Sequence, residues 1–467
     1  MVKLAGIILA AGQGKRMLSA RPKVLHEVAG RPMVAWSVLA ALEAGAEQVV
    51  VVVAPQQVQA VGDVLRPLAP ERIRLVIQEQ ARGTGDAARI GLDAVDAASV
   101  LILCGDTPLL TGEDLAPLLG SLDAAPGRKV VVGSCVLDNP KGYGRILRDT
   151  QGNPREIRED RDLRDDAERS VREVNAGVYA ADVEWLRGQL QQLRPDNAQG
   201  EYYLTDAVLA AVGQGAAAVV QGAAEVSLGV NDRAQLSEVE ALMHRRIASS
   251  HARRGVTIHG QPIIDAEVEI APDAELFDGV QLRGGTKIRA GVRIDVGCVI
   301  TDSTVEAGAV LKPYSVVTSS TVGERAQIGP FAHLRPESVI EEEAHIGNFV
   351  ETKKTRVRRG AKANHLAYLG DGDVGEKANV GAGTIFCNYD GFMKHKTTIG
   401  PGAFIGSDSQ IVAPVTIGAG AYVGTGTTVT QDVPEDALAI SRVRQENKLG
   451  YAARLRGRLA AAKKAKG

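Results

Sequence analysis

Aromatic side chains are scarce in this chain of 467 residues: Phe, Trp and Tyr together account for 4% of it, although hydrophobic residues as a whole reach 45%. A core packed around large rings is therefore disfavoured, and small aliphatic side chains are expected to fill it. Glycine is abundant by contrast, at 52 residues, which predicts many turns.

Cysteine is also sparse. The four cysteines, Cys104, Cys135, Cys298 and Cys387, lie far apart and form no Cys-x-x-Cys pair. This spacing suggests neither a zinc knuckle nor a disulfide framework, and it fits reduced thiols in a cytosolic protein.

The sequence further lacks an excess charge and a long apolar run. It has 54 basic and 56 acidic residues, a formal net charge of -2. This balance provides no field that would gather nucleic acid or an anionic membrane, so we expect a small-molecule or protein partner instead. No segment approaches the roughly 20 apolar residues of a membrane span, and the apolar stretch at the N-terminus is too short for a signal peptide. We therefore expect a cytoplasmic protein.

The length of the chain exceeds what one hydrophobic core supports, so two or three domains are expected. In the first half, short aliphatic runs alternate with amphipathic stretches such as residues 33–44, which predicts βαβ units around a mainly parallel sheet. The runs expected to form buried strands are residues 5–10, 49–54, 73–78, 100–103 and 130–136. Ligands then belong at the carboxyl ends of these strands.

A different periodicity begins after a single amphipathic helix that we expect at residues 236–254. Aliphatic residues then recur every six positions, which fits neither a helix nor an alternating strand and identifies a hexapeptide β-helix. The repeat markers are Ile258, Ile264, Ile270, Leu276, Leu282, Ile288, Ile294, Ile300, Val305, Leu311, Val317, Val322, Ile328, Leu334, Ile340, Ile346, Ile399, Ile405, Ile411, Ile417, Val423 and Val429. With about 18 residues per coil, the repeat predicts roughly ten coils.

These patterns divide the chain into four parts. We expect an α/β Rossmann-like domain over residues 1–230, a linker helix over 231–254, a hexapeptide-repeat domain over 255–440 and a tail over 441–467. The tail is rich in alanine and basic residues, and we interpret it as a solvated chain end.

The segment LAAGQGKRM, residues 9–17, follows the first expected strand and offers backbone N–H groups to a phosphate. It is neither G-x-G-x-x-G nor a Walker A loop, because Arg16 stands where the latter has Ser or Thr. Taken alone, it is as compatible with an ordinary turn as with a phosphate site.

Other polar positions complete a set with this segment. They are Arg16, Lys23, Gln78, the GTG of residues 83–85, Asp106, the GYGR of 142–145, Glu159, the NAG of 175–177, the EYYLTD of 201–206 and the GVN of 229–231. The set resembles the sugar-1-phosphate nucleotidyltransferases over the whole first half of the chain. It is similar in particular to the bifunctional family of N-acetylglucosamine-1-phosphate uridylyltransferases and glucosamine-1-phosphate acetyltransferases.

The resemblance implies that N-acetylglucosamine 1-phosphate attacks the α-phosphorus of UTP and that pyrophosphate leaves, so charge on phosphoryl oxygens has to be neutralised. In this comparison Arg16 and Lys23 are the catalytic cations, and Asp106 with Asn231 holds the cofactor Mg²⁺. The residues implied to face the nucleotide sugar are Leu9, Ala10, Ala11, Gly12, Lys23, Gln78, Gly83, Thr84, Gly144, Glu159, Asn175, Thr205 and Asn231.

In the second half, no aliphatic residue marks the repeat between Ile385 and Ile399, where the sequence FCNYDGFMKHKTT intervenes. Such an insertion maps to a loop on one face, often the binding face. With FAHLRP at residues 331–336, NFVETKK at 348–354 and NHLAYLGD at 364–371, the segment resembles the acetyltransferase half of the same bifunctional family.

This resemblance makes His365 the general base that takes a proton from the amine of glucosamine 1-phosphate as it attacks acetyl-CoA. The residues implied to bind glucosamine phosphate are Arg335, Lys353, Tyr368, Asn379 and Lys394, and those implied for acetyl-CoA are Asn388, Tyr389, Ser407, Thr425 and Arg442. The family is also expected to wind its β-helix left-handed and to form homotrimers in which Lys394 reaches a neighbour's site. Its product feeds peptidoglycan and lipopolysaccharide precursors.

Two alternatives remain open at this stage. The repeat can be an oligomerising or regulatory prop without chemistry, which needs neither His365 nor the cations Arg335 and Lys353. The chain can also be a non-catalytic assembly subunit of similar domain order, which predicts an eroded phosphate loop, whereas Arg16, Lys23 and Asp106 are all present.

Overall fold

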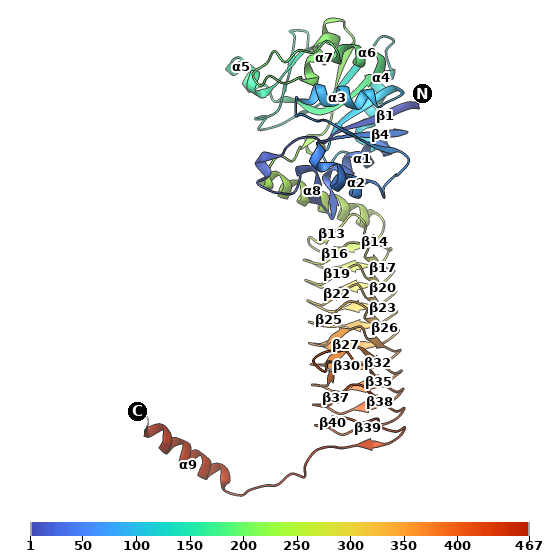
Figure 1. Cartoon of the computed structure of the whole chain (residues 1–467), viewed down its shortest axis with the longest axis vertical. Helices are drawn as coiled ribbons and strands as arrows, with labels where there is room; N and C mark the ends of the chain where they lie inside the picture. The colour runs from blue at the N-terminus through green and yellow to red at the C-terminus, as the bar shows by residue number, and fades with distance from the viewer. Residues whose placement is uncertain (1, 466–467) are drawn as a thin grey trace. The chain divides into compact units, whose positions relative to one another are not determined.

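The computed structural model describes residues 2–465, which divide into two compact units (Figure 1). The first unit extends to Ser250 and includes Ile264–Ala266, and the second comprises His251–Ile263 and everything from Glu267 onward. Among the described residues, no helix combines the length and apolar character that crossing a bilayer requires.

The first unit is built on a mixed sheet with the strand order β11-β7-β10-β6-β1-β4-β5. The strands are β1 (Val2–Leu9), β4 (Gln48–Val53), β5 (Ile73–Ile77), β6 (Ala97–Cys104), β7 (Val130–Val136), β10 (Glu173–Asp182) and β11 (Ala217–Gln221). Five of these match the strands expected from the aliphatic runs. The sheet is mainly parallel as predicted, but β10 runs antiparallel to both β6 and β7. A hairpin of β8 (Arg145–Arg148) and β9 (Pro154–Arg158) joins the sheet through β10.

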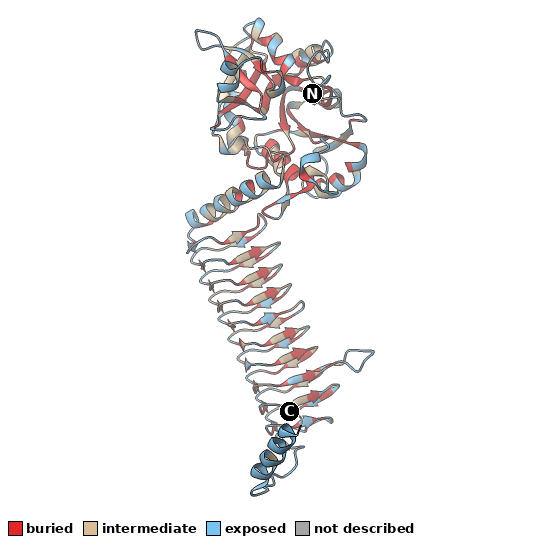
Figure 2. Cartoon of the chain, turned by 90° about the vertical axis from the view of Figure 1, so that its left-hand side faces the viewer, coloured by how far each residue is buried: buried red, intermediate tan, exposed pale blue. Residues whose placement is uncertain are grey.

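Helices cover both faces of this sheet, which explains why its strands read as continuous apolar runs. Ile7 of β1 belongs to one hydrophobic cluster and its neighbour Ile8 to another, because successive side chains of a strand point to opposite faces. The helices are α1 (Met33–Glu43), α2 (Val58–Leu65), α3 (Thr84–Asp93), α4 (Gly112–Asp123), α5 (Asp166–Ser170), α6 (Val183–Leu190) and α7 (Leu204–Gly213). The buried strands stand out in red in Figure 2.

The expected linker helix is α8 (Arg233–Arg253). Its buried residues Val239 and Met243 pack with Met17, Val28 and Met33 of the first unit. These contacts, together with the inclusion of residues up to Ser250 in the first unit, attach most of the helix to that unit.

The second unit is a left-handed parallel β-helix of the hexapeptide type. Its strands form three parallel sheets of 11, 10 and 9 strands, in which nearly every strand pairs with the one three positions further along the chain. The first sheet runs from β12 (Thr257–Ile258) to β41 (Leu438–Ala439), the second from β13 (Ile263–Ile264) to β40 (Thr428–Val429), and the third from β14 (Glu269–Ile270) to β38 (Val415–Ile417).

Aliphatic repeat markers fill the interior of this β-helix: Leu282, Ile300 and Ile346, for example, are fully buried. Ile258 and Ile270 are only half-buried, because they lie in the first coil, which has a neighbouring coil on one side only. After the last coil the chain continues to the exposed helix α9 (Tyr451–Lys464).

Candidate functional site

The carboxyl ends of β1, β4, β5 and β6 lie at one edge of the first sheet, and the predicted nucleotide residues follow them. The backbone N–H of Ala10 donates to Val52 O at 2.9 Å, that of Gln78 to Val53 O at 2.9 Å, and that of Gly105 to Leu9 O at 3.0 Å. The segment Leu9 to Gly12, Gln78 and Asp106 therefore emerge side by side, as expected for ligand sites of α/β sheets.

Lys23, Asp106 and Asn231 converge at this edge. The ammonium of Lys23 forms an ion pair with the carboxylate of Asp106 and donates to Asn231 Oδ1 at 3.0 Å. The backbone N–H of Val230 donates to Asp106 O at 2.9 Å, which ties the Asn231 segment to the end of β6. Lys23 and Asp106 side chains are only 13% and 19% exposed, so these charges interact away from bulk water.

The same oxygens fit a bound cation. Within residues 2–465 no group of three or more His, Cys, Asp or Glu side chains could hold a metal ion. Asp106 and Asn231 nevertheless direct two hard oxygen atoms at one point, which the Lys23 ammonium occupies. Because Mg²⁺ usually keeps several waters and shares substrate phosphates, two protein oxygens suffice for it.

The predicted catalytic residue Arg16 lies apart from this cluster. It belongs to the short 3-10 helix Lys15–Met17, is exposed, and forms no ion pair within the described chain. The turn before it is fixed by Gly14, whose φ is 58°. A Cβ added at Gly14 would lie 2.5 Å from Lys23 Cβ, so only glycine lets this turn pack against Lys23.

Gln78, Gly83 and Thr84 form a second group. Gln78 is buried and its amide nitrogen donates to Gly83 O at 3.3 Å and to Asp86 Oδ2 at 2.9 Å. The hydroxyl of Thr84 accepts from the backbone N–H of Leu204 at 3.2 Å, which joins the start of α3 to that of α7. Asp86 was not singled out from the sequence, although it follows the GTG segment directly.

The predicted sugar residues are also brought together. Thr205 Oγ1 donates to Glu159 Oε1 at 3.3 Å, and a Cβ on Gly144 would lie 3.3 Å from the Glu159 carboxylate. The backbone N–H of Asn175 donates to Gly144 O at 2.8 Å, and its amide donates to the hydroxyl of Tyr179 at 2.6 Å. Burial raises the pKa of Glu159 and, more strongly, that of Tyr179.

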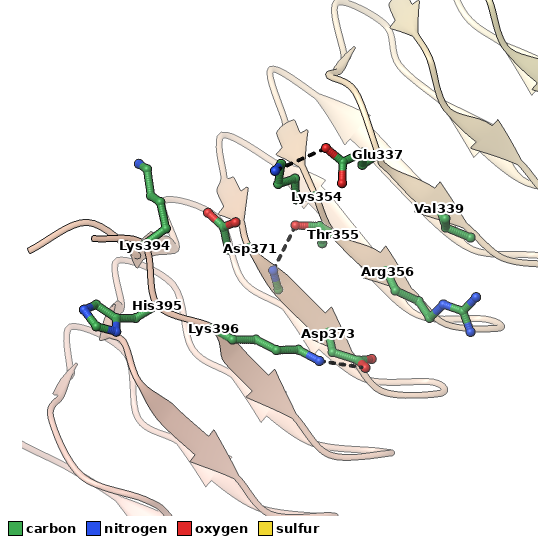
Figure 3. A pocket seen from close by; sticks show the side chains of 11 residues that line it. Glu337, Val339, Lys354, Thr355, Arg356, Asp371, Asp373, Lys394, His395 and Lys396 are labelled. Atoms are coloured by element: carbon green, nitrogen blue, oxygen red, sulfur yellow. Dashed lines mark hydrogen bonds and ion pairs between the residues drawn. The ribbon is translucent and has the colours of Figure 1, made fainter. Parts of the chain in front are cut away.

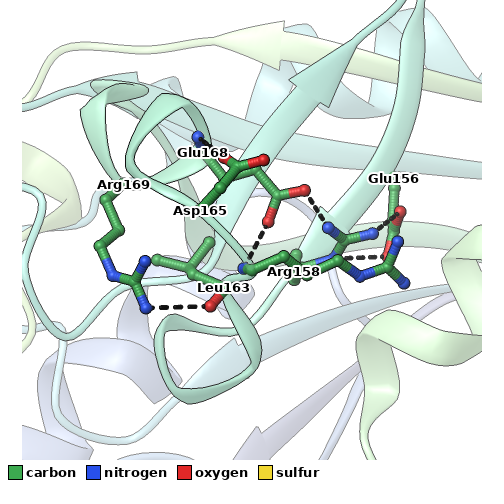
Figure 4. A network of polar contacts seen from close by, with 7 residues as sticks. Glu156, Arg158, Leu163, Asp165, Glu168 and Arg169 are labelled. Atoms are coloured by element: carbon green, nitrogen blue, oxygen red, sulfur yellow. Dashed lines mark hydrogen bonds and ion pairs between the residues drawn. The ribbon is translucent and has the colours of Figure 1, made fainter.

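An ionic network holds the segment that carries Glu159 (Figure 4). Arg158, only 5% exposed, pairs with Glu156 at 2.6 Å and with Glu168. Glu168 also accepts from the backbone N–H of Arg164 at 2.8 Å, while its own N–H donates to Asp165. The network therefore anchors β9 to α5 and leaves the next residue, Glu159, on the side of Gly144 and Thr205.

Cys104, the last residue of β6, lies between the Asp106 segment and the strand that carries Asn175. Its thiol donates to Gly177 O at 3.7 Å, and desolvation, with a smaller contribution from Asp106, raises its pKa to about 12. It is therefore a neutral thiol near neutral pH, with no nucleophilic role.

In the second unit, four of the predicted acetyltransferase residues lie at the ends of strands on neighbouring coils, around the second sheet. His365 is exposed at the end of β30 (Lys362–His365), and Tyr368 begins β31 (Tyr368–Gly370) after the corner. Lys353 ends β28 (Glu351–Lys353), which pairs with β31. Arg335 follows β25 (His333–Leu334), which pairs with β28. His365 and Tyr368 thus lie at the corner before the second sheet, Lys353 and Arg335 lie at the opposite ends of strands of that sheet, and the four residues span three successive coils.

Arg335 and Lys353 differ in their partners. Arg335 donates to Glu351 Oε1 at 2.7 Å, and this hydrogen bond raises the pKa of the guanidinium. Lys353 forms no ion pair within the described chain, so its charge is available to a ligand.

Asn388 contacts both Tyr368 and Asp371, a residue to which the sequence assigned no role. The buried Asn388 donates to Asp371 Oδ2 at 2.5 Å and lies 3.5 Å from the Tyr368 hydroxyl. A Cβ at Gly370 would lie 2.5 Å from both Asn388 Nδ2 and the Tyr368 hydroxyl, so glycine at this position makes room for the cluster.

The remaining predicted residues lie on or after strands of the first sheet. Asn379, predicted to bind glucosamine phosphate, begins β33 (Asn379–Val380). Of the predicted coenzyme A residues, Ser407 follows β36 (Phe404–Ile405), Thr425 follows β39 (Tyr422–Val423) and Arg442 follows β41. The guanidinium of Arg442 donates to Thr425 O, and the N–H of Gly426 donates to Ser407 O at 2.9 Å. Asn379, Ser407, Thr425 and Arg442 therefore lie on successive coils that follow the coil of His365.

The predicted insertion is a loop between β34 (Ile385–Cys387) and β35 (Thr397–Ile399). It borders a cavity of about 450 Å³ at the corner between the second and third sheets. Lys354, Arg356, Asp373 and Lys396 are among the residues that line this cavity (Figure 3). Lys354 pairs with Glu337 at 3.2 Å and Lys396 with Asp373 at 3.6 Å. Lys394 contacts none of these acids and stacks on the Tyr389 ring at 4.6 Å, so the structure does not bring it to His365 within one chain.

An exposed apolar ladder runs along the corner that carries His365. Tyr314, Phe331 and Phe349 stack with ring centroids 5.3 and 5.5 Å apart, and Leu366 continues the series on the next coil. All four residues have positive φ and are about half exposed or more. This ladder is a contiguous exposed apolar surface on the β-helix.

Comparisons with known proteins agree with this two-part organisation. The model of the MobA-like NTP transferase domain matches residues 6–154, and the bacterial transferase hexapeptide model matches residues 396–431. The bifunctional protein GlmU of Sorangium cellulosum is 59% identical over 461 residues, 98% of this chain and 97% of its own. Proteins with the same name from Trichlorobacter lovleyi and Caldanaerobacter subterraneus are 47% and 45% identical over 96% and 97% of this chain and 97% and 98% of their own.

Proposed function

Given that the chain belongs to the GlmU family of bifunctional uridylyltransferases and acetyltransferases, we propose that its two sites make UDP-N-acetylglucosamine in two steps. The β-helix acetylates glucosamine 1-phosphate with acetyl-CoA, and the sheet domain then joins the product to UTP with release of pyrophosphate. The observation that carries the proposal is the convergence of Lys23, Asp106 and Asn231 at the nucleotide edge of the first sheet.

In uridylyl transfer, the residues of this edge bind and neutralise phosphates. Lys23 and Arg16 supply positive charge, and the segment from Leu9 to Gly12 supplies backbone N–H groups. The family depends on a divalent metal, and we propose Mg²⁺ held by Asp106 and Asn231. When bound, it neutralises charge on the phosphoryl oxygens. With a cation held by Asp106 and Asn231, Lys23 would no longer be needed to neutralise Asp106, and its ammonium could contact phosphate.

The sugar pocket is formed by Gly144, Glu159, Asn175 and Thr205. Three of these side chains offer hydrogen-bonding groups to sugar hydroxyls and to the N-acetyl group. Their mutual contacts and the buried network around Arg158 support a pre-ordered pocket, which lowers the entropy cost of binding.

The metal assignment is tested with Asp106→Asn, which keeps the shape of the side chain but removes its charge. We expect Mg²⁺-dependent pyrophosphate release to fall by about 10² or more, and thiol release from acetyl-CoA to be retained. Asp138→Asn, a change at a fully exposed aspartate on the same domain, is the matched control. Near-normal uridylyl transfer by folded Asp106→Asn would contradict the assignment.

In acetyl transfer, His365 takes a proton from the sugar amine while the amine nitrogen attacks the thioester carbonyl. The C–S bond then breaks, and the leaving thiolate of coenzyme A takes that proton from His365 and departs as the thiol. Arg335 and Lys353 bind the sugar phosphate and Tyr368 and Asn379 the sugar, while Asn388 and Tyr389 position the thioester. Ser407, Thr425 and Arg442 line the coenzyme A path. A structural prop needs none of these groups, so their presence on neighbouring coils supports the catalytic interpretation.

We further propose a homotrimer in the cytoplasm, where UTP and acetyl-CoA are available. The apolar ladder of Tyr314, Phe331, Phe349 and Leu366 supports a second copy packed against this corner. In such an assembly Lys394, which points away from its own chain's ion pairs, completes the site of a neighbour. Phe349→Asp is expected to shift the sedimentation of the protein to that of a single chain, whereas Leu459→Asp, a change at an exposed apolar residue of α9, is the control. A trimer that survives Phe349→Asp would argue against this interface.

A further inference from the structure

Asp86 is a buried carboxylate without an assigned role at the nucleotide edge. It lies in the first turn of α3 and is 7% exposed. Its two oxygens are both used: Oδ2 accepts from the amide of Gln78 at 2.9 Å, and Oδ1 accepts from Arg89 Nη2 at 2.8 Å. The helix dipole by itself favours an acidic residue in the first turn of α3, but it does not explain the contact between Asp86 and Gln78.

The contact determines which way the amide of Gln78 faces. A carboxylate paired with arginine only accepts hydrogen bonds, so the NH₂ group of Gln78 has to point toward Asp86. The second N–H of the same nitrogen is directed at Gly83 O, 3.3 Å away. Both donors are thus consumed inside the protein, and no group in residues 2–465 donates to Gln78 Oε1. Gln78 can present only an acceptor to a ligand.

We propose that Asp86 is a specificity-determining residue that makes Gln78 select uracil over cytosine. This rests on the proposed function, uridylyl transfer from UTP, together with the family resemblance, which implies that Gln78 faces the uridine. Uracil carries an N–H donor at N3, which matches the acceptor of Gln78. Cytosine has an unprotonated, accepting nitrogen at that position and would meet Gln78 Oε1 acceptor to acceptor. A site that leaves buried polar groups unpaired rejects the wrong ligand strongly.

The test compares kcat/KM for UTP and CTP in the wild type and in Asp86→Asn. The amide introduced there donates as well as accepts, so Gln78 can turn and offer its NH₂ group to cytosine N3. We expect kcat/KM for UTP to fall, that for CTP to rise, and their ratio to decrease at least about tenfold. Asp93→Asn is the matched control, because Asp93 lies on the same helix, 4.0 Å from Arg89, and is exposed. Its ratio should equal that of the wild type.

A second comparison shows whether Asp86 acts through Gln78. In a Gln78→Ala background, Asp86→Asn should no longer change the ratio, because the orientation of the amide is the only route proposed. An unchanged ratio in folded Asp86→Asn, or the same change in both backgrounds, would overturn the inference. Failure of the proposed function would look different: the wild type itself would then not use UTP. Thiol release by the β-helix and the thermal midpoint report that the variants fold.

Discussion

At the scale of single residues, neighbouring groups hold the ligand-facing side chains of both candidate sites. Asn175 donates to Tyr179, Gln78 to Asp86, and Arg335 to Glu351. A side chain already fixed by a neighbour loses less conformational entropy when a ligand binds. Some neighbours of the predicted ligand residues are therefore expected to affect selectivity and affinity as strongly as the ligand residues themselves.

His365→Ala is expected to slow acetyl transfer by about 10² to 10⁴, because a positioned base typically contributes this much. The imidazole is exposed, so the substitution should leave the thermal midpoint nearly unchanged. The measurement is thiol release from acetyl-CoA in the presence of glucosamine 1-phosphate.

Two controls accompany this variant. His333→Ala removes an exposed imidazole from the same β-helix and should retain activity. Uridylyl transfer from supplied N-acetylglucosamine 1-phosphate should be the same in all three proteins. Acetylation by oligomeric His365→Ala within a few-fold of the wild type would exclude His365 as the base.

Gly14→Ala tests the turn before Arg16. Alanine is strained at a φ of 58°, and its Cβ would lie 2.5 Å from Lys23 Cβ, so Lys23 has to move. We expect kcat/KM for uridylyl transfer to fall at least about tenfold, since even a small misplacement of a positioned group is costly. Gly120→Ala in α4, where an added Cβ meets nothing within 4 Å, should have full activity. If the two variants are equally active, the turn does not position Lys23.

At the scale of elements, both candidate sites form where strands end. In the first unit parallel strands bring the predicted ligand groups to one edge of the sheet, and in the second unit these groups lie at the ends of strands on neighbouring coils.

His251 near the end of α8 makes the stability of the chain dependent on pH. It is 4% exposed, and burial together with the Arg254 charge lowers its pKa from 6.5 to about 4. The guanidinium of Arg254 lies 3.2 Å from Nδ1, which keeps that nitrogen an acceptor. The folded chain thus favours the neutral ring, so its contribution is complete above pH 6.5 and is lost as the pH falls toward 4. By linkage, up to about 3 kcal/mol is at stake.

We therefore expect His251→Gln to have a urea midpoint that falls less than that of the wild type between pH 7 and pH 4.5. His259→Gln, a change at an exposed histidine, should follow the wild type. Parallel curves for all three proteins would show that His251 does not contribute to the acid sensitivity.

At the scale of the whole molecule, the decisive prediction is that residues of two chains together form one acetyltransferase site. Lys394→Ala and His365→Ala are each expected to impair acetyl transfer. If Lys394 completes a neighbour's site, co-refolding the two variants should restore part of the activity, because some sites then have both residues intact. The control is a mixture of the two variants that were refolded separately, so that their oligomers contain only one kind of subunit. Absence of recovery in a verified mixed oligomer would confine each site to one chain.

Much of the architecture follows from the sequence alone. The period of six identifies the β-helix, because no other regular structure buries every sixth side chain, and the buried aliphatic runs locate five strands of the first sheet to within a few residues. The antiparallel direction of β10 could not be read in this way, since an apolar run buried on both faces carries no sign of its direction. The roles of the site residues stay predictions for the experiments above.

Tertiary structure decided which distant residues meet. Lys23 and Asn231 lie 208 positions apart and come into contact only because the order of the strands brings their segments to one edge. The contacts of Asp86 with Gln78 and of Asp371 with Asn388 likewise depend on backbone positions that no local pattern encodes. The apolar ladder is an intermediate case: Tyr314, Phe331, Phe349 and Leu366 recur about once per coil in the sequence, but only the winding of the coils stacks their side chains on one corner. Local periodicity specifies elements, whereas contacts between elements are set by how they pack.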